Sequence, residues 1–225
     1  MQANVKSRTR KLVILAMLSA IAYAVMYFGR IALLPAAPFL KYDPKDVIIA
    51  IGGFLYGPLA ALAMSIVVSF AEMVTVSESG IIGCIMNIIS TVSFTCTAAF
   101  IYKKFRTLTG AAIGLAVGVA LCTTVMLLWN YLLVPIYTPY ISRETVTGML
   151  VPIFLPFNLL KGGLNAAVAM LLYKPVRIAL DKARLVPIKA DTGVKTAKLN
   201  VGVILVSAFI VATCVLIILA LQGVI

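Results

Sequence analysis

The sequence predicts an all-α integral membrane protein, and three observations lead to that fold class. Of its 225 residues, 63% are hydrophobic and only 12% are charged, and the mean hydropathy is +1.11. A soluble globular domain is closer to half apolar and a quarter charged, so a soluble fold of this size could not bury so much apolar surface. The apolar residues also fall into long runs, with room for six or seven spans of about 20 residues each.

The apolar runs divide the chain into seven expected spans. The second run is short and ends at Gly57-Pro58, so we expect it to be tilted or broken, and it could form a hairpin with the third. The basic start before the first run would also fit a signal peptide, although the run is long for one. The expected spans are 11–29, 46–56, 58–75, 81–102, 109–133, 149–173 and 200–222.

Basic residues lie almost entirely on one side of these spans. If the spans alternate, fourteen of the 19 lysines and arginines fall at the N-terminus, after the fourth span, and between the sixth and seventh spans. The positive-inside rule then places the N-terminus in the cytoplasm and the C-terminus outside. The net charge of +12 is therefore mainly an orientation signal, with binding to anionic membrane lipid as a by-product and no indication of nucleic acid.

The sequence contains few residues or motifs from which a metal, cofactor or catalytic site could be built. The chain has no histidine, and its four cysteines lie in apolar segments without a C-x-x-C pair, so we expect no metal site and no cofactor. It lacks the P-loop, G-x-S-x-G and H-E-x-x-H motifs, which speaks against a built-in ATPase and against an enzyme. The two halves show no inverted repeat, which weighs against a secondary transporter.

A polar stripe interrupts the sixth expected span. Asn158, Lys161 and Asn165 are spaced i, i+3 and i+7, which puts them on one face of a helix. Lys161 is the only lysine or arginine expected within a span away from its ends. Intramembrane charges are costly, so they usually face the bundle interior and mark a function. With Asn130 of the fifth span, the stripe could line an outward-facing cavity.

Two structural alternatives remain open for the stripe. Lys161 could reach the outer headgroups if Pro152 and Pro156 delay the start of the helix. Glu72, late in the third span, could pair with Lys161 for structural reasons alone. As a ligand site, an amine and carboxamides suit a neutral or weakly acidic heteroaromatic ring that carries carbonyls and a ring N–H. A single lysine is little provision for a phosphate.

The connection between the first two spans, residues 29–46, is expected outside the cell. It is long, stiffened by prolines, and carries apolar residues, which makes it a candidate lid. The alternative is a loop that lies on the lipid surface. In the first span, Ala16 and Ala20 form a small-residue pattern that would let another helix approach closely. A glycine ridge in the fifth span, at 110, 114 and 118, is expected to pack internally.

Together these residues resemble a known family. FLKYDPKD followed by IGGFLYGPLAA, the A-x-x-x-A of the first span, and the N-x-x-K of Asn158 and Lys161 are similar to the S-component of energy-coupling factor (ECF) vitamin transporters. The resemblance is greatest to the riboflavin-specific S-component and covers about residues 10–180. It implies a six-helix S-component-like bundle in a prokaryotic cell membrane, which captures riboflavin outside and has no enzymatic activity. An S-component for another vitamin, or a self-sufficient small-molecule carrier, remain alternatives.

The resemblance also implies partners and residue roles. A transmembrane T-component would contact Ala16 and Ala20, and two cytoplasmic ATPase subunits would supply energy. The side chains implied in riboflavin binding come from three spans and the lid: Asn130, Asn158, Lys161, Asn165, Glu72, Leu40, Lys41, Tyr42 and Asp43. Of these, Asn130, Asn158 and Lys161 would meet the polar edge of the isoalloxazine ring, and Glu72 would reach the ribityl hydroxyls.

The same reading divides the chain into three parts. Residues 1–180 would form the six-span binding domain, residues 181–199 a basic cytoplasmic linker, and residues 200–225 an extra C-terminal transmembrane helix. This seventh span departs from the six spans of the family, and the sequence assigns it no task.

Overall fold

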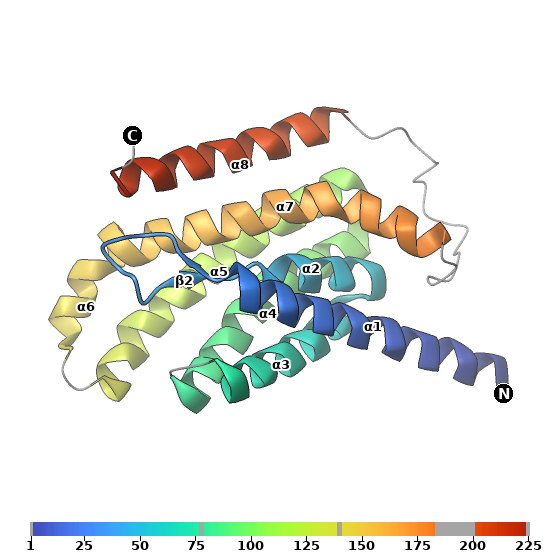
Figure 1. Ribbon diagram of the computed structural model, residues 1–225, viewed down its shortest axis with the longest axis horizontal. Coiled ribbons are helices and arrows are strands. Elements are labelled where there is room, and N and C mark those ends of the chain that lie inside the picture. Colours follow the sequence, from blue (N-terminus) through green and yellow to red (C-terminus); the bar gives the residue numbers. More distant parts are fainter. Residues whose placement is uncertain (1, 77–78, 139–140, 183–200, 224–225) are drawn as a thin grey trace.

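The computed structural model describes residues 2–76, 79–138, 141–182 and 201–223. Within them, long helices pack side by side, and the all-α prediction is confirmed (Figure 1). The one described sheet is a short hairpin in which Ile31 pairs antiparallel with Tyr42. The elements are α1 (Gln2–Gly29), β1 (Ile31–Ala32), β2 (Lys41–Tyr42), α2 (Lys45–Tyr56), α3 (Pro58–Thr75), α4 (Gly80–Phe105), α5 (Leu108–Tyr137), α6 (Arg143–Met149), the π-helix η1 (Leu150–Phe154), α7 (Leu155–Lys182) and α8 (Val201–Leu221).

Six segments of the described chain are long and apolar enough to cross a membrane. The expected second span is not among them. Its helix, α2, has 12 residues and rises only about 18 Å, whereas the hydrocarbon core is about 30 Å thick. The expected span 46–56 is therefore a helix that is too short to cross the membrane by itself. The six segments are Arg8–Gly29, Pro58–Thr75, Gly80–Phe105, Leu108–Tyr137, Arg143–Val176 and Val201–Leu221.

The chain nevertheless reverses direction between α1 and α3. The ammonium of Lys11, early in α1, lies 5.8 Å from the ring centroid of Tyr56, just before α3. Near the other ends of the two helices, the Tyr23 hydroxyl donates to Thr75 at 2.9 Å. Because α1 and α3 run parallel, the loop after α1 and the short α2 together must bring the chain back. They act as one return pass, which brings the chain back to the end of the bundle where α1 begins.

Helix α1 begins on the right in Figure 1, and two contacts place the basic last turn of α4 and the end of α7 towards the same end of the bundle. Cys96, late in α4, donates to the carbonyl of Pro58 at the start of α3, so α4 ends near that position. The hydroxyls of Tyr102 and Tyr173 are hydrogen-bonded, which brings the end of α4 beside α7 one residue before Lys174. Helix α7 continues to Lys182, and the rest of the expected linker lies outside the described residues.

The glycine ridge of α5 packs internally, as expected. A Cβ on Gly114 would lie 2.7 Å from the carbonyl oxygen of Ala98, and one on Gly118 would lie 2.6 Å from that of Phe94. Real Cβ atoms do not approach backbone so closely, so glycine allows α4 and α5 to meet backbone to backbone. By contrast, α8 packs along α7 at the surface, and of its 21 residues only Ser207 and Cys214 are buried.

Candidate functional site

Three cations and three carboxylates meet inside the bundle, and we call them the ionic cluster. They come from the loop after α1, from α2, α3 and α7: Arg30, Asp43, Lys45, Asp46, Glu72 and Lys161. Their formal charges cancel. A buried charge without a partner is strongly destabilising, so mutual pairing explains how six charged side chains occupy this interior.

Lys161 pairs with carboxylates from the N-terminal part of the chain. Its Nζ lies 3.7 Å from Asp43 Oδ2 and 3.9 Å from Asp46 Oδ2, and its side chain is only 13% exposed. The alternative in which Lys161 reaches the outer headgroups is therefore wrong. The alternative pairing with Glu72 is also wrong, because the ion pairs of Glu72 within the described chain are with Lys45 and Arg30.

Lys45 corrects the expectation that Lys161 is the only intramembrane basic residue. Lys45 is 0% exposed and pairs with Glu72 of α3, and its Nζ lies 3.7 Å from Asp43. Arg30 reaches Glu72 from the other side at 3.3 Å. The alternation of the expected spans placed Lys45 in the outer loop 29–46. The loop instead enters the bundle and carries Lys45 to the level of Glu72.

Asp46 connects three helices and was missed by the sequence analysis. It lies in the first turn of α2, is 2% exposed, and accepts hydrogen bonds from Thr91 of α4 at 2.7 Å and from Asn165 of α7 at 3.4 Å. With its ion pair to Lys161, it contacts two of the three residues of the polar stripe. Its place in the FLKYDPKD motif was the one signal available, but the motif looked like a loop.

The loop between α1 and α2 packs into the bundle. Leu33 and Ala37 are 0% exposed, and both belong to an apolar cluster that includes Phe157, Leu160 and Leu164 of α7. The alternative of a loop lying on the lipid surface is therefore wrong. Leu40 is half-buried against the same cluster, whereas Lys41 is exposed on the hairpin.

Tyr42 and Asp43 end this loop with opposite hydrogen-bonding roles. The Tyr42 hydroxyl donates to Asn165 Oδ1 at 2.9 Å. Asp43 faces two cations, because its Oδ2 lies 3.7 Å from the Nζ of Lys45 and 3.7 Å from the Nζ of Lys161. Its buried Oδ1 has no hydrogen-bond partner among the described residues.

Asn130 and Asn158 are buried but stand apart from this network. Each donates from its side-chain amide to the carbonyl four residues earlier, Asn130 to Met126 at 2.7 Å and Asn158 to Phe154 at 2.8 Å. Across the described ranges, neither is hydrogen-bonded to the ionic cluster. The structure thus joins Lys161, Asn165, Glu72, Tyr42 and Asp43 in one network and gives the two other asparagines backbone partners.

Two further expectations concern the surface and metals. Ala16 and Ala20 are exposed on α1, so another helix could reach them. In the described part of the chain, no three His, Cys, Asp or Glu side chains are placed to hold a metal ion.

The chain is similar to known transport proteins. The family "ECF transporter, substrate-specific component" matches residues 10–173. The riboflavin transporter FmnP of Bacillus subtilis is 31% identical over 186 residues, which cover 79% of this chain and 97% of that protein. The riboflavin transporter RibU of Streptococcus thermophilus is 28% identical over 184 residues, which cover 78% of this chain and 87% of that protein.

A solved structure agrees with these relatives. Reported as the S component of a bacterial ECF transporter, it is 30% identical, covers 77% of this chain and 98% of its own, and superposes with a TM-score of 0.64. Helix α8 lies beyond residues 10–173, which the family matches. The short α2 and the buried loop before it lie within them. The chain belongs to the family of substrate-specific components of ECF transporters, which are transport subunits and not enzymes.

Proposed function

We propose that this chain is the riboflavin-binding subunit of an ECF importer, which captures the vitamin outside the cell and delivers it inward. The relatives named as riboflavin transporters support this proposal. The observation that carries the site assignment is the contact of Lys161 and Asn165 with Asp43, Asp46 and Tyr42 beneath an apolar loop. Donors and acceptors converge there, as the polar edge of a flavin ring requires.

On binding, riboflavin would replace some of the contacts that the residues of the ionic cluster make with one another. Lys161 would turn its ammonium from Asp43 to a ring carbonyl, and the unpaired Oδ1 of Asp43 would accept from a ring N–H or a ribityl hydroxyl. Leu33 and Ala37 would cover the apolar faces of the ring. The cluster has no net formal charge, so a neutral ligand leaves its balance intact. A phosphorylated flavin would add negative charge beside three carboxylates.

The membrane setting of this function follows from the basic end of the bundle. We infer that this end faces the cytoplasm, which puts the N-terminus inside and the end of α8 outside. The exposed Ala16 and Ala20 would receive the T-component, with two ATPase subunits bound to it on the cytoplasmic side. Ala16→Trp should leave riboflavin binding unchanged and abolish uptake by the assembled complex. Unchanged uptake would remove α1 from the docking surface.

The decisive experiment is a titration of the purified protein with riboflavin, in which binding is measured by the quenching of flavin fluorescence. Lys161→Met should weaken binding by about 1–3 kcal/mol, roughly 5- to 150-fold, because buried acceptors lose their donor. The matched control is Lys103→Met, an exposed lysine at the basic end, which should bind like the parent. Equal binding by Lys161→Met and the parent would refute the site.

The two rival functions predict different results. If the parent itself neither purifies with yellow colour nor quenches added riboflavin, the vitamin is a different one. If the chain alone moves riboflavin into vesicles without a T-component or ATPases, it is a self-sufficient carrier.

A further inference from the structure

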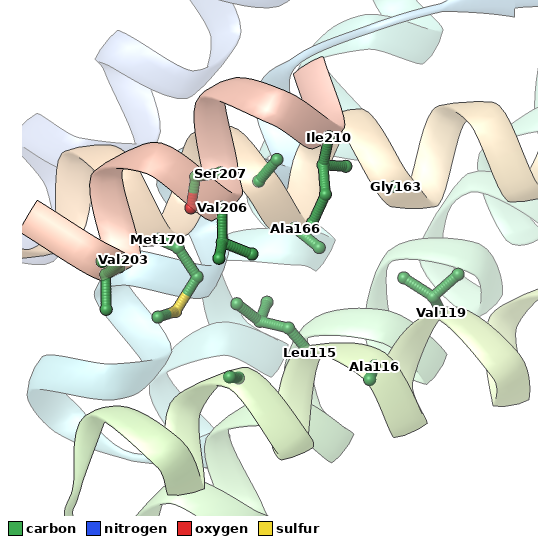
Figure 2. A pocket seen from close by; sticks show the side chains of 13 residues that line it. Leu115, Ala116, Val119, Gly163, Ala166, Met170, Val203, Val206, Ser207 and Ile210 are labelled. Atoms are coloured by element: carbon green, nitrogen blue, oxygen red, sulfur yellow. The ribbon is translucent and has the colours of Figure 1, made fainter. Parts of the chain in front are cut away.

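A cavity lies between α5, α7 and α8, and none of its lining residues belongs to the ionic cluster. Its volume is about 610 Å³, within the range of about 300–1,000 Å³ usual for small-molecule sites. Figure 2 shows Val206 of α8 and Leu115 of α5 facing one another across it. Its walls are small and aliphatic side chains together with Met170, and the one hydroxyl among them belongs to Ser207. We call this cavity the α8 groove.

The groove forms because α8 touches α7 at one end and leaves space at the other. A Cβ on Gly163 would lie 3.6 Å from the Cys214 Sγ, so the two helices are close there. Towards the start of α8, the facing positions on α5 and α7 are alanines such as Ala112, Ala116 and Ala166. Because the side chains of α5 and α7 that face α8 are small here, the space between the three helices is not filled.

The groove faces the bilayer. All three of its helices belong to the segments that can cross a membrane, and Ala112, Ala116 and Val206 on its walls are exposed. An occupant must therefore be apolar along most of its length. The groove extends over residues 163–170 of α7, roughly 10 Å of helix. A protein helix, about 10 Å across, would have to displace α8 to enter it.

Basic residues lie near the end of the groove that is lined by Ala112 and Met170. Ala112 lies one turn after the start of α5, and Met170 lies one turn before Lys174. Arg106 precedes α5 and is exposed, and α4 ends beside it with Lys103 and Lys104. Basic pockets between transmembrane helices on the cytoplasmic side characteristically bind anionic headgroups.

We propose that the α8 groove binds one acyl chain of an anionic phospholipid, whose headgroup is held at the basic end of the bundle. The lipid fills the space that α8 leaves against α5 and so fastens this additional helix to the bundle. This site is separate from the ionic cluster and does not depend on which ligand the cluster binds.

Native mass spectrometry of the full-length, delipidated protein tests the proposal, with phosphatidylglycerol and phosphatidylcholine as probes. The parent should retain phosphatidylglycerol at least fivefold more than phosphatidylcholine. Ala116→Trp fills the groove and should remove this retention. The matched control is Ile113→Trp, which is exposed on the same helix but does not line the groove, and it should retain lipid like the parent.

The headgroup is tested separately. Arg106→Gln combined with Lys174→Gln should abolish the preference for phosphatidylglycerol, whereas Arg143→Gln at the opposite end should keep it. Equal retention of the two lipids by the parent overturns the headgroup assignment. Retention that survives Ala116→Trp overturns the groove itself and leaves only annular lipid. Where Ala116→Trp fails to fold, as judged by its thermal melting, Ala112→Leu takes its place with the same expected result.

Discussion

The hydroxyl of Tyr42, in the loop before α2, donates a hydrogen bond of 2.9 Å to the side-chain oxygen of Asn165 on α7. The next residue, Asp43, pairs with Lys161 one turn earlier on the same helix. Two adjacent loop residues thus hold two residues of the polar stripe. Opening the loop must break both contacts, so the loop and the polar face of α7 are mechanically coupled.

Tyr42→Phe should speed the release of riboflavin. The substitution keeps the ring but leaves Asn165 Oδ1 without its donor, which should destabilise the closed form of the loop by about 1 kcal/mol. This loss corresponds to a roughly fivefold faster dissociation of riboflavin. Stopped-flow fluorescence measures the dissociation rate. Tyr27→Phe, an exposed tyrosine on α1, is the control and should not change it. An unchanged rate for Tyr42→Phe would show that the hydrogen bond does not hold the loop.

Asp46→Asn should weaken riboflavin binding without direct ligand contact. It removes the charge that faces Lys161 and disturbs the partner of Asn165, so the two residues lose their fixed positions. We expect a loss of about 1–3 kcal/mol in the binding titration. In a Lys161→Met background the same change should cost less, because its effect acts partly through Lys161. Additive losses would argue that Asp46 acts only on folding. Glu144→Gln, an exposed carboxylate, serves as the neutral control.

Substitutions of Lys45 and Glu72 should have strongly coupled effects on the stability of the protein. Lys45→Met alone leaves the buried Glu72 with Arg30 as its remaining ion-pair partner in the described chain, and removing one member of a buried pair typically costs about 3–5 kcal/mol. Glu72→Gln should be similarly harmful. The double variant should lose less than the sum of the two, as measured by thermal melting in detergent. A simple sum would mean that the two side chains do not stabilise each other.

Gly118→Ala should destabilise the bundle by about 1–3 kcal/mol, because its Cβ would press on the Phe94 carbonyl oxygen and push α5 from α4. Gly148→Ala in α6 is a matched control. A Cβ there meets nothing within 4 Å, and alanine is the better helix former. Thermal melting should therefore separate the two substitutions in opposite directions. Equal melting temperatures would contradict the close approach of α4 and α5.

Helix α8 should slow the opening of the loop. Val211 and Ile218 pack against the apolar cluster that contains Leu33 and Ala37. Removing both side chains, as alanines, should raise the riboflavin dissociation rate severalfold, because the cluster loses apolar contact in its closed form. The same truncation of Phe209 and Leu216, which are exposed on α8, should leave the rate unchanged. If both pairs of substitutions changed the dissociation rate equally, α8 would have no specific effect on the opening of the loop.

Much of this molecule is readable from local sequence patterns. Hydropathy located the six long apolar segments to within about six residues, since a span must be apolar along its whole length, although α1 begins earlier and α7 ends later than the expected spans. The spacing of Asn158, Lys161 and Asn165 put them on one buried face, and the glycines of α5 marked its contact with α4. These features depend on residues within one helix, so no tertiary information was needed.

The partners of the charged residues could not be read in this way. Lys45 and Asp46 follow a proline-rich loop, and nothing in their neighbourhood distinguishes a loop on the membrane surface from one that enters the bundle. Likewise, a 12-residue apolar helix has the composition of a span but not its length. Only its combination with the loop before it makes a return pass.

The sequence by itself therefore determined the membrane class, the long helices, the gathering of basic residues and the polar face of α7. The tertiary structure decided that Lys161 meets Asp43 and Asp46, while Glu72 meets Lys45 and Arg30. The physical reason is that apolar burial acts on each helix separately. Buried charges are stable only against a specific opposite charge, and which one is in reach depends on how the loop and α2 dock between α3, α4 and α7.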